Sequence, residues 1–243
     1  MKKIILVCVL LFLPMVSSAD IIDEITAKNE IVVGVKADYK PYGFLDEFDN
    51  YQGIEIELAR DRDVADKLNV DIRFVPVISA NRMEYLSQRK IDLMIATITD
   101  KPERRKIVYA SDPNYSSSES NVLTSRSDVN QWEELSGKKV CGITGAFYNK
   151  SIQQKYGAIL TIFDDTEDAL NALKNQQCSA FVYDDSFLAG LLTDENWSVK
   201  YEISFETIDD TPWALAVRNG EERLHTLMNE MIIVGIKPAE FWL

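Results

Sequence analysis

The chain has 243 residues, of which 46% are hydrophobic and 27% charged, and its formal net charge at pH 7 is −13. A hydrophobic fraction of this size is typical of a chain that folds around a core, and it excludes a disordered chain. The negative charge, with no local basic stripe to offset it, disfavours partners such as nucleic acid or anionic lipid.

Residues 1–19 have the three parts of a secretory signal peptide. Two lysines form the basic start, 4–16 are apolar, and 17–19 are the small residues of a cleavage site. The apolar run contains Pro14 and is too short to span a bilayer. Cleavage after Ala19 removes two lysines and changes the net charge to −15. We therefore expect an exported, periplasmic protein.

Short strands alternate with helices along the rest of the chain. Apolar patterns predict strands at 31–35, 70–75, 91–96, 107–109, 121–124, 140–143, 159–163, 180–183, 199–205 and 214–217. Helices are predicted at about 54–68, 82–89, 132–135, 145–156, 169–175, 187–192 and 221–234. This alternation indicates an α/β protein with mainly parallel sheets.

The helix expected at 54–68 contains an apparent duplication, Arg-Asp-Arg-Asp at 60–63. Two inserted residues turn an α-helix by about 200°, so its two halves cannot share one straight buried face. We therefore expect a kink near Asp61.

The stretch 91–104 combines a buried strand with a helix start. Asp100 is the expected N-cap, and Glu103 three residues later completes a capping-box pattern. Arg104 follows at once. Helix N–H groups and a guanidinium fork together suit the binding of a carboxylate. The alternative is a simple strand–helix turn whose arginine is only solvated.

Two cysteines remain after the leader, Cys141 and Cys178. An even pair in an exported protein suggests one disulfide, although two buried thiols are the alternative. The single histidine, His225, excludes a multi-histidine metal site. We expect no metal and no cofactor.

Six segments carry a family resemblance: VGVKADYKPYGF at 33–44, GIEIEL at 53–58, ANRMEYLSQRKIDLMIATITDKPERRK at 80–106, GKKVCGITGA at 137–146, CSAFVYDD at 178–185 and WALAVRNG at 213–220. In this order they resemble the bacterial extracellular solute-binding proteins of family 3, which capture polar amino acids for ABC importers. The resemblance covers nearly all of the mature chain.

The resemblance implies a two-lobe periplasmic binding protein-like fold of type II, in which two crossing strands join the lobes. The first lobe would hold residues 20–113 and 208–243, and the second would hold 114–207. A free amino acid would be clamped in the cleft by hinge closure, without catalysis. The implied partners are this ligand and an inner-membrane ABC permease complex, and the protein is expected to be a monomer that binds no nucleic acid.

The resemblance also assigns ligand-binding roles. Arg104 matches the arginine that grips the ligand α-carboxylate, and Asp184 matches the carboxylate that takes the α-ammonium from the opposite lobe. Thr97 and Thr99 match strand-end hydrogen-bonding positions. Pairing both charges of a zwitterion offsets the cost of removing it from water.

Further positions follow from the same resemblance. Tyr39 and Tyr42 match an aromatic wall, while Thr144 and Gly145 match a turn whose N–H groups face the ligand. Some family members have a disulfide at the positions of Cys141 and Cys178. We predict this bridge.

Lys36 and Arg82 match positions that are cationic in members binding aspartate or glutamate. They favour an acidic ligand, with a small neutral or sulfur-containing amino acid such as cysteine as the alternative. Solvated surface roles are the ordinary explanation for both residues.

The chain departs from the family pattern at several positions. Lys101 replaces a usual threonine, and Ala146 and Phe147 replace small hydroxyl residues. Glu55 follows Ile54 where an aromatic residue and aspartate are usual, and we assign it a structural role.

Two other function classes remain open on this fold. A cyclohexadienyl dehydratase-like enzyme would need a general acid or base, for which Glu55, Asp38 and Asp185 are candidates. All three are more simply explained as surface or loop carboxylates. A sensor or adhesin would instead bind a protein partner.

Overall fold

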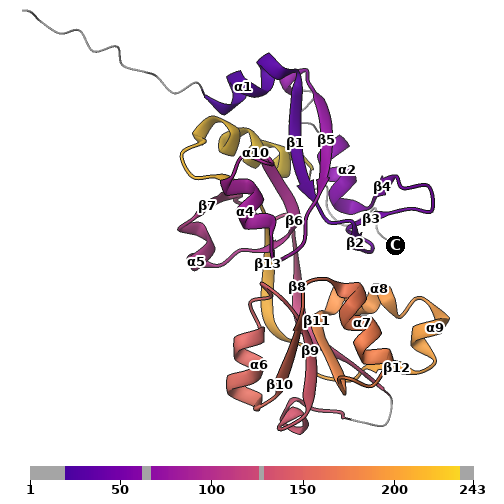
Figure 1. Ribbon diagram of the computed structural model, residues 1–243. Coiled ribbons are helices and arrows are strands. Elements are labelled where there is room, and N and C mark those ends of the chain that lie inside the picture. The colour runs from indigo at the N-terminus through magenta and orange to yellow at the C-terminus, as the bar shows by residue number, and fades with distance from the viewer. Residues whose placement is uncertain (1–19, 62–66, 126–128, 236–243) are drawn as a thin grey trace, which may run out of the picture.

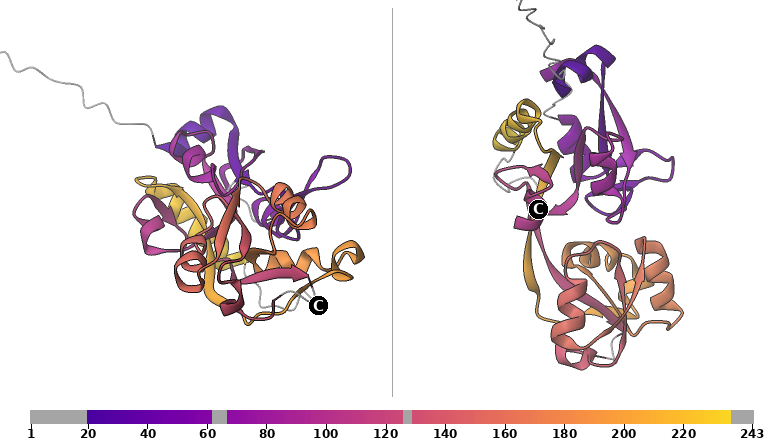
Figure 2. Two further views of the ribbon diagram at one scale, coloured as in Figure 1. Left: turned by 60° about the horizontal axis from the view of Figure 1, so that its bottom comes forward. Right: turned by 60° about the vertical axis from the view of Figure 1, so that its left-hand side comes forward.

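The computed structural model describes residues 20–61, 67–125 and 129–235. Two α/β lobes are joined by two long strands, β8 (Ser116–Ser125) and β13 (Ile208–Arg218) (Figure 1). The right-hand view of Figure 2 shows the two lobes apart from one another, with the connecting strands running between them. The expected two-lobe α/β fold is therefore confirmed. The signal peptide, its cleavage site and the segment after Asp61 that bears on the expected kink lie outside the described residues.

One continuous sheet runs through both lobes in the order β10-β9-β11-β8-β13-β6-β1-β5. In the first lobe, β1 (Glu30–Val35) lies between β5 (Asp71–Pro76) and β6 (Leu93–Thr99) and is parallel to both. The end of β13 pairs antiparallel with β6 and with β7 (Val108–Ala110). β6 therefore has a partner on each side.

Helices cover both faces of the first-lobe sheet, which explains why β6 is buried along its whole length. Leu93 and Ile95 face one apolar cluster, while Met94 and Ala96 face the other. The first-lobe helices are α1 (Ile21–Lys28), α2 (Ile54–Asp61), α4 (Arg82–Ser87), α5 (Pro102–Arg105) and α10 (Glu222–Gly235). A small sheet beside them contains β2 (Asp38–Tyr39), β3 (Gly43–Leu45) and β4 (Tyr51–Gln52).

Helix α1 was not expected from the sequence. The side chain of Asp20 accepts a hydrogen bond from the Ile22 N–H and caps the helix. Ile21, Ile22 and Ile25 are buried in the cluster that also contains α10 side chains. Tertiary packing against the far end of the chain therefore supports a helix of only eight residues.

In the second lobe, β9 (Lys139–Ile143) lies between β10 (Ile159–Phe163) and β11 (Ala180–Asp184), parallel to both. β8 pairs antiparallel with β11 and with the short β12 (Tyr201–Ile203). The strand expected at 199–205 is thus shorter than predicted. The helices are η1 (Trp132–Leu135), α6 (Asn149–Tyr156), α7 (Thr166–Lys174), α8 (Asp185–Leu191) and α9 (Glu195–Ser198). Over the described ranges, every helix is too short or too polar to cross a membrane.

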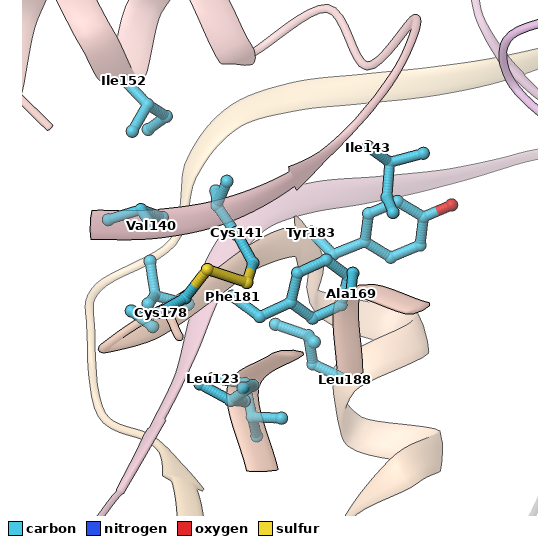
Figure 3. Packing of buried hydrophobic residues seen from close by; sticks show 14 of the residues in the cluster. Leu123, Val140, Cys141, Ile143, Ile152, Ala169, Cys178, Phe181, Tyr183 and Leu188 are labelled. Atoms are coloured by element: carbon cyan, nitrogen blue, oxygen red, sulfur yellow. A yellow bond between two sulfur atoms is a disulfide. The ribbon is translucent and has the colours of Figure 1, made fainter. Parts of the chain in front are cut away.

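Cys141 and Cys178 form a disulfide, as predicted. It lies in the second-lobe core, where Figure 3 shows it beside Val140 and Phe181. The bridge ties the middle of β9 to the residue two positions before β11. It therefore fixes two parallel strands of the lobe that carries Asp184.

We expect loss of this bridge to destabilise the protein by about 4 kcal/mol, because a cross-link over 37 residues restricts the unfolded chain. Urea unfolding of the Cys141→Ala/Cys178→Ala variant measures the loss. Reduced wild-type protein is the matched control, since it keeps both sulfur atoms in the core. Equal unfolding midpoints for oxidised and reduced wild type would contradict the prediction.

Candidate functional site

A small cavity lies between the lobes and holds about 250 Å³ of space between atoms. Part of this space is open to solvent, and the enclosed free volume is only about 10 Å³, which is room for about one water molecule. An amino acid can therefore occupy it only when the lobes lie further apart than they do here. We call it the cleft cavity. Its walls are Ser79, Arg82, Thr97, Thr99 and Arg104 from the first lobe, and Ala146, Phe147, Tyr148, Tyr183 and Asp184 from the second.

The cavity brings together half of the residues expected to bind a ligand. Arg82, Thr97, Thr99, Arg104 and Asp184 line it. The other five expected residues are absent from its walls, namely Lys36, Tyr39, Tyr42, Thr144 and Gly145.

Five wall residues were not among those expected to bind a ligand, namely Ser79, Ala146, Phe147, Tyr148 and Tyr183. Two of them carried a usable signal. Tyr183 directly precedes Asp184 at a strand end, and Ser79 lies one helical turn before Arg82. Ala146 and Phe147 carried an indirect signal as departures from the family pattern, whereas Tyr148 offered none.

Thr97 lines the cavity and has an unusual backbone conformation. Its φ of 48° is in the left-handed region, which is strained for a β-branched residue. The Thr97 N–H donates to the Glu55 carboxylate at 2.7 Å and also faces the Tyr115 hydroxyl at 3.1 Å. A buried carboxylate from α2 therefore holds the end of β6 in place.

Glu55 is buried, and the prediction of a surface or loop carboxylate at this position was wrong. Its exposed fraction is 0%, and burial raises its pKa to about 7. One carboxylate oxygen accepts hydrogen bonds from the Thr97 N–H and the Tyr115 hydroxyl. Glu55 lies outside the cavity wall. Its assignment to a structural role agrees with these contacts.

The helix that carries Arg104 begins differently from the prediction. Lys101, not Asp100, is the N-cap of α5, and no side chain caps the helix. The Asp100 carboxylate instead accepts hydrogen bonds from Arg105 at 2.6 Å and Asn114 at 2.9 Å. These two stronger partners explain why the capping-box prediction was wrong.

Arg104 extends from α5 into the cleft. Its guanidinium donates to the Thr99 carbonyl at 2.9 Å and, across the cleft, to the Gly145 carbonyl at 3.2 Å. Burial lowers its pKa to about 10, so the group stays positive at neutral pH. Neither contact neutralises the charge.

Arg82 is a buried cation with an exposed fraction of 4%. Its guanidinium donates to the Ala96 carbonyl and to the Thr97 hydroxyl at 3.4 Å. Within the described part of the chain, no carboxylate forms an ion pair with it. A buried, unpaired guanidinium in a cavity wall is costly unless a ligand completes it.

Asp184 is the carboxylate of the cavity, and its exposed fraction is 8%. Tyr39 from the first lobe donates to its Oδ2 at 2.8 Å. Burial raises its pKa to about 6. The Tyr39 ring packs in the second-lobe core against Tyr183 and Phe187. The Tyr39 hydroxyl thus holds the Asp184 carboxylate in position from outside the cavity wall.

The remaining expected residues lie around the cavity. The Lys36 ammonium is 1% exposed and 3.9 Å from the Asp38 carboxylate, and burial lowers its pKa. Tyr42 packs edge-on against Trp213. The Thr144 N–H donates to the Phe163 carbonyl within the second lobe.

The lobes are closed on one another. The Thr166 hydroxyl donates across the cleft to Asp38 at 2.7 Å, in addition to the Tyr39 and Arg104 contacts. Gly145 has a φ of 80°, and a Cβ there would lie 2.7 Å from the Ser79 carbonyl oxygen of the other lobe. A glycine at this turn is therefore needed for the observed approach.

Several known proteins are similar to this chain. The glutamine-binding protein of an ABC transporter from Bacillus subtilis is 30% identical over 222 residues, covering 88% of this chain and 78% of that protein. A glutamate/aspartate import solute-binding protein from Salmonella typhimurium is 22% identical, covering 87% and 73%. A crystal structure of a solute receptor for L-cysteine from Neisseria gonorrhoeae is 25% identical, with a TM-score of 0.81 and coverage of 88% and 87%.

Residues 31–234 match the model of a single protein family. This range includes most of both lobes, both connecting strands and every wall residue of the cleft cavity. The chain belongs to the bacterial extracellular solute-binding proteins, family 3.

Proposed function

We propose that this protein binds an acidic amino acid, aspartate or glutamate, in the cleft cavity and delivers it to an ABC importer. The observation that carries the proposal is the charge of the wall, which has two guanidinium groups and one carboxylate. Neither Arg82 nor Arg104 has an ion-pair partner among the described residues. A ligand with two carboxylates and one ammonium complements this set.

Each charge of such a ligand has one partner. Arg104 grips the α-carboxylate, Asp184 takes the α-ammonium, and Arg82 pairs with the side-chain carboxylate. The hydroxyls of Thr97 and Thr99 add hydrogen bonds. Arg104 and Asp184 come from different lobes, so a bound zwitterion favours the closed state over the open one.

The family and its relatives support the delivery step. One relative is named as the glutamine-binding protein of an ABC transporter and another as a glutamate/aspartate import solute-binding protein. A permease complex in the inner membrane is then the partner of a monomeric, periplasmic protein. In this proposal residues 20–113 and 208–243 of the binding protein move as one lobe, and residues 114–207 move as the other.

The first test is thermal melting of the mature protein against the twenty amino acids, after unfolding and refolding to remove any bound ligand. A ligand at 100 times its dissociation constant adds about 2.7 kcal/mol of stability. We expect a selective rise with aspartate or glutamate. A rise with cysteine or another small neutral amino acid alone would overturn the acidic preference and retain Arg104 and Asp184 as the binding pair.

Replacing Arg82 with methionine should separate acidic from neutral ligands. We expect aspartate and glutamate to bind about 100-fold more weakly, because one buried carboxylate loses its partner. Residual binding of a neutral amino acid such as glutamine should change far less. Titration calorimetry with both ligands measures the two effects, and equal losses would contradict the assignment of Arg82 to the side-chain carboxylate.

An enzymatic function on this fold receives no support from the candidate carboxylates. Glu55 does not line the cavity, and Asp185 accepts hydrogen bonds from the Ser118 hydroxyl and the Glu119 N–H. Asp38 is held by Thr166. None of the three faces a ligand in the cavity as a free general acid or base.

A further inference from the structure

Two residues that depart from the family pattern meet across the cleft. The Lys101 ammonium lies 4.3 Å from the centre of the Phe147 ring. Lys101 is the N-cap of α5 in the first lobe, and Phe147 lies in the turn between β9 and α6 in the second. An ammonium at this distance from an aromatic ring makes an attractive cation–π contact.

The position of this contact ties it to the ligand site. Phe147 lines the cleft cavity and packs edge-on against Tyr148, also a wall residue. Lys101 is three residues before Arg104, whose guanidinium crosses the cleft to the Gly145 carbonyl. The Lys101–Phe147 contact therefore adjoins the ligand-binding arginine where the two lobes meet.

The contact also differs from the other cation–π contacts of the described residues. Those of Lys36, Lys40, Arg60 and Lys90 each join two residues that belong to the first lobe. Those of Lys155 and Lys174 lie within the second. An intralobe contact persists whether the cleft is open or closed, but the Lys101–Phe147 contact requires closure.

We propose that Lys101 and Phe147 form a latch that stabilises the closed state without touching the charges of the ligand. This inference rests on the proposed function, since the latch acts on a ligand enclosed by the lobes. A contact made only in the closed state shifts the open–closed equilibrium toward closure. A ligand leaves through the open state, so the latch slows its release.

The test uses the Lys101→Met and Phe147→Leu variants and the double variant. Methionine keeps an unbranched apolar stem, and leucine keeps an apolar side chain without the ring. We expect each single variant to release L-glutamate about three to ten times faster in stopped-flow measurements, given the usual strength of a partly buried cation–π contact. The double variant should be no faster than the faster single variant, because both changes remove one contact.

Lys90→Met is the matched control. It removes the same charge and a contact of similar length, 4.5 Å to the Tyr85 ring, within the first lobe. Its release rate should equal that of wild type. Release rates of the Lys101 and Phe147 variants that equal this control, or effects that multiply in the double variant, would overturn the latch.

A second measurement, which needs no ligand, tests the latch even if the proposed ligand is wrong. If L-glutamate and L-aspartate fail to bind wild type, the acidic ligand is wrong, and small-angle scattering of ligand-free protein decides on the latch. A larger radius of gyration in Lys101→Met than in Lys90→Met would then support it. Equal radii would reject it.

Discussion

Replacing Arg104 with alanine should weaken ligand binding by several hundred-fold or more, equivalent to about 3–5 kcal/mol. Arg104 lines the cavity without an ion-pair partner among the described residues, so the ligand carboxylate is its natural counter-charge. Its loss leaves a buried carboxylate unpaired and also removes the hydrogen bond to the Gly145 carbonyl across the cleft. Titration calorimetry with the ligand identified by thermal melting measures the loss.

Lys106→Ala is the control for the change in net charge. Lys106 follows the same short helix and its side chain is exposed. Binding should be unchanged in this variant, and both variants should melt near the wild-type temperature without ligand. Normal binding by Arg104→Ala would show that the arginine does not hold the ligand carboxylate.

The Glu55→Gln variant should remove about 3 kcal/mol of pH dependence from the stability of the ligand-free protein. In the unfolded chain Glu55 releases its proton near pH 4.5, whereas burial raises its pKa in the folded protein to about 7. Between these values the folded state holds a proton that the unfolded state has released. Raising the pH through this window therefore destabilises wild type.

Glutamine keeps an oxygen that can accept from the Thr97 N–H but does not titrate. The measured quantity is the difference in unfolding free energy between wild type and Glu55→Gln at pH 4.5 and at pH 7.5. Glu57→Gln is the control, since Glu57 is an exposed carboxylate on the same helix. A pH-independent difference for Glu55→Gln would mean that the folded protein does not retain the Glu55 proton.

The sequence predicted the architecture well because its periodic apolar segments are local signals. The strand before Arg104 and the strand ending at Asp184 were both placed correctly. Their roles, however, came from the family resemblance, because no local pattern pairs two residues on different lobes. The disulfide between Cys141 and Cys178 was expected both from the even pair of cysteines in an exported chain and from the resemblance.

Contacts between distant segments account for what the sequence could not predict. Glu55 and Thr97 are separated by 42 residues, and Tyr39 and Asp184 by 145. Tyr39 was expected in the cavity wall, but its ring is buried in the opposite lobe and only its hydroxyl reaches the site. Asp100 was predicted to cap a helix, but its carboxylate accepts hydrogen bonds from Arg105 and Asn114 instead.

The path of β13 also determines when the two lobes can be completed as the chain is made. Thr99 in β6 pairs with Trp213, which is synthesised 114 residues later, after every strand of the second lobe. Until then β6, apolar along most of its length, has one unpaired edge, and such an edge invites association with other chains. The second-lobe strand β8 also pairs with β13, and Trp213 packs in the second-lobe core. Neither lobe can therefore complete its sheet until this last strand has been made.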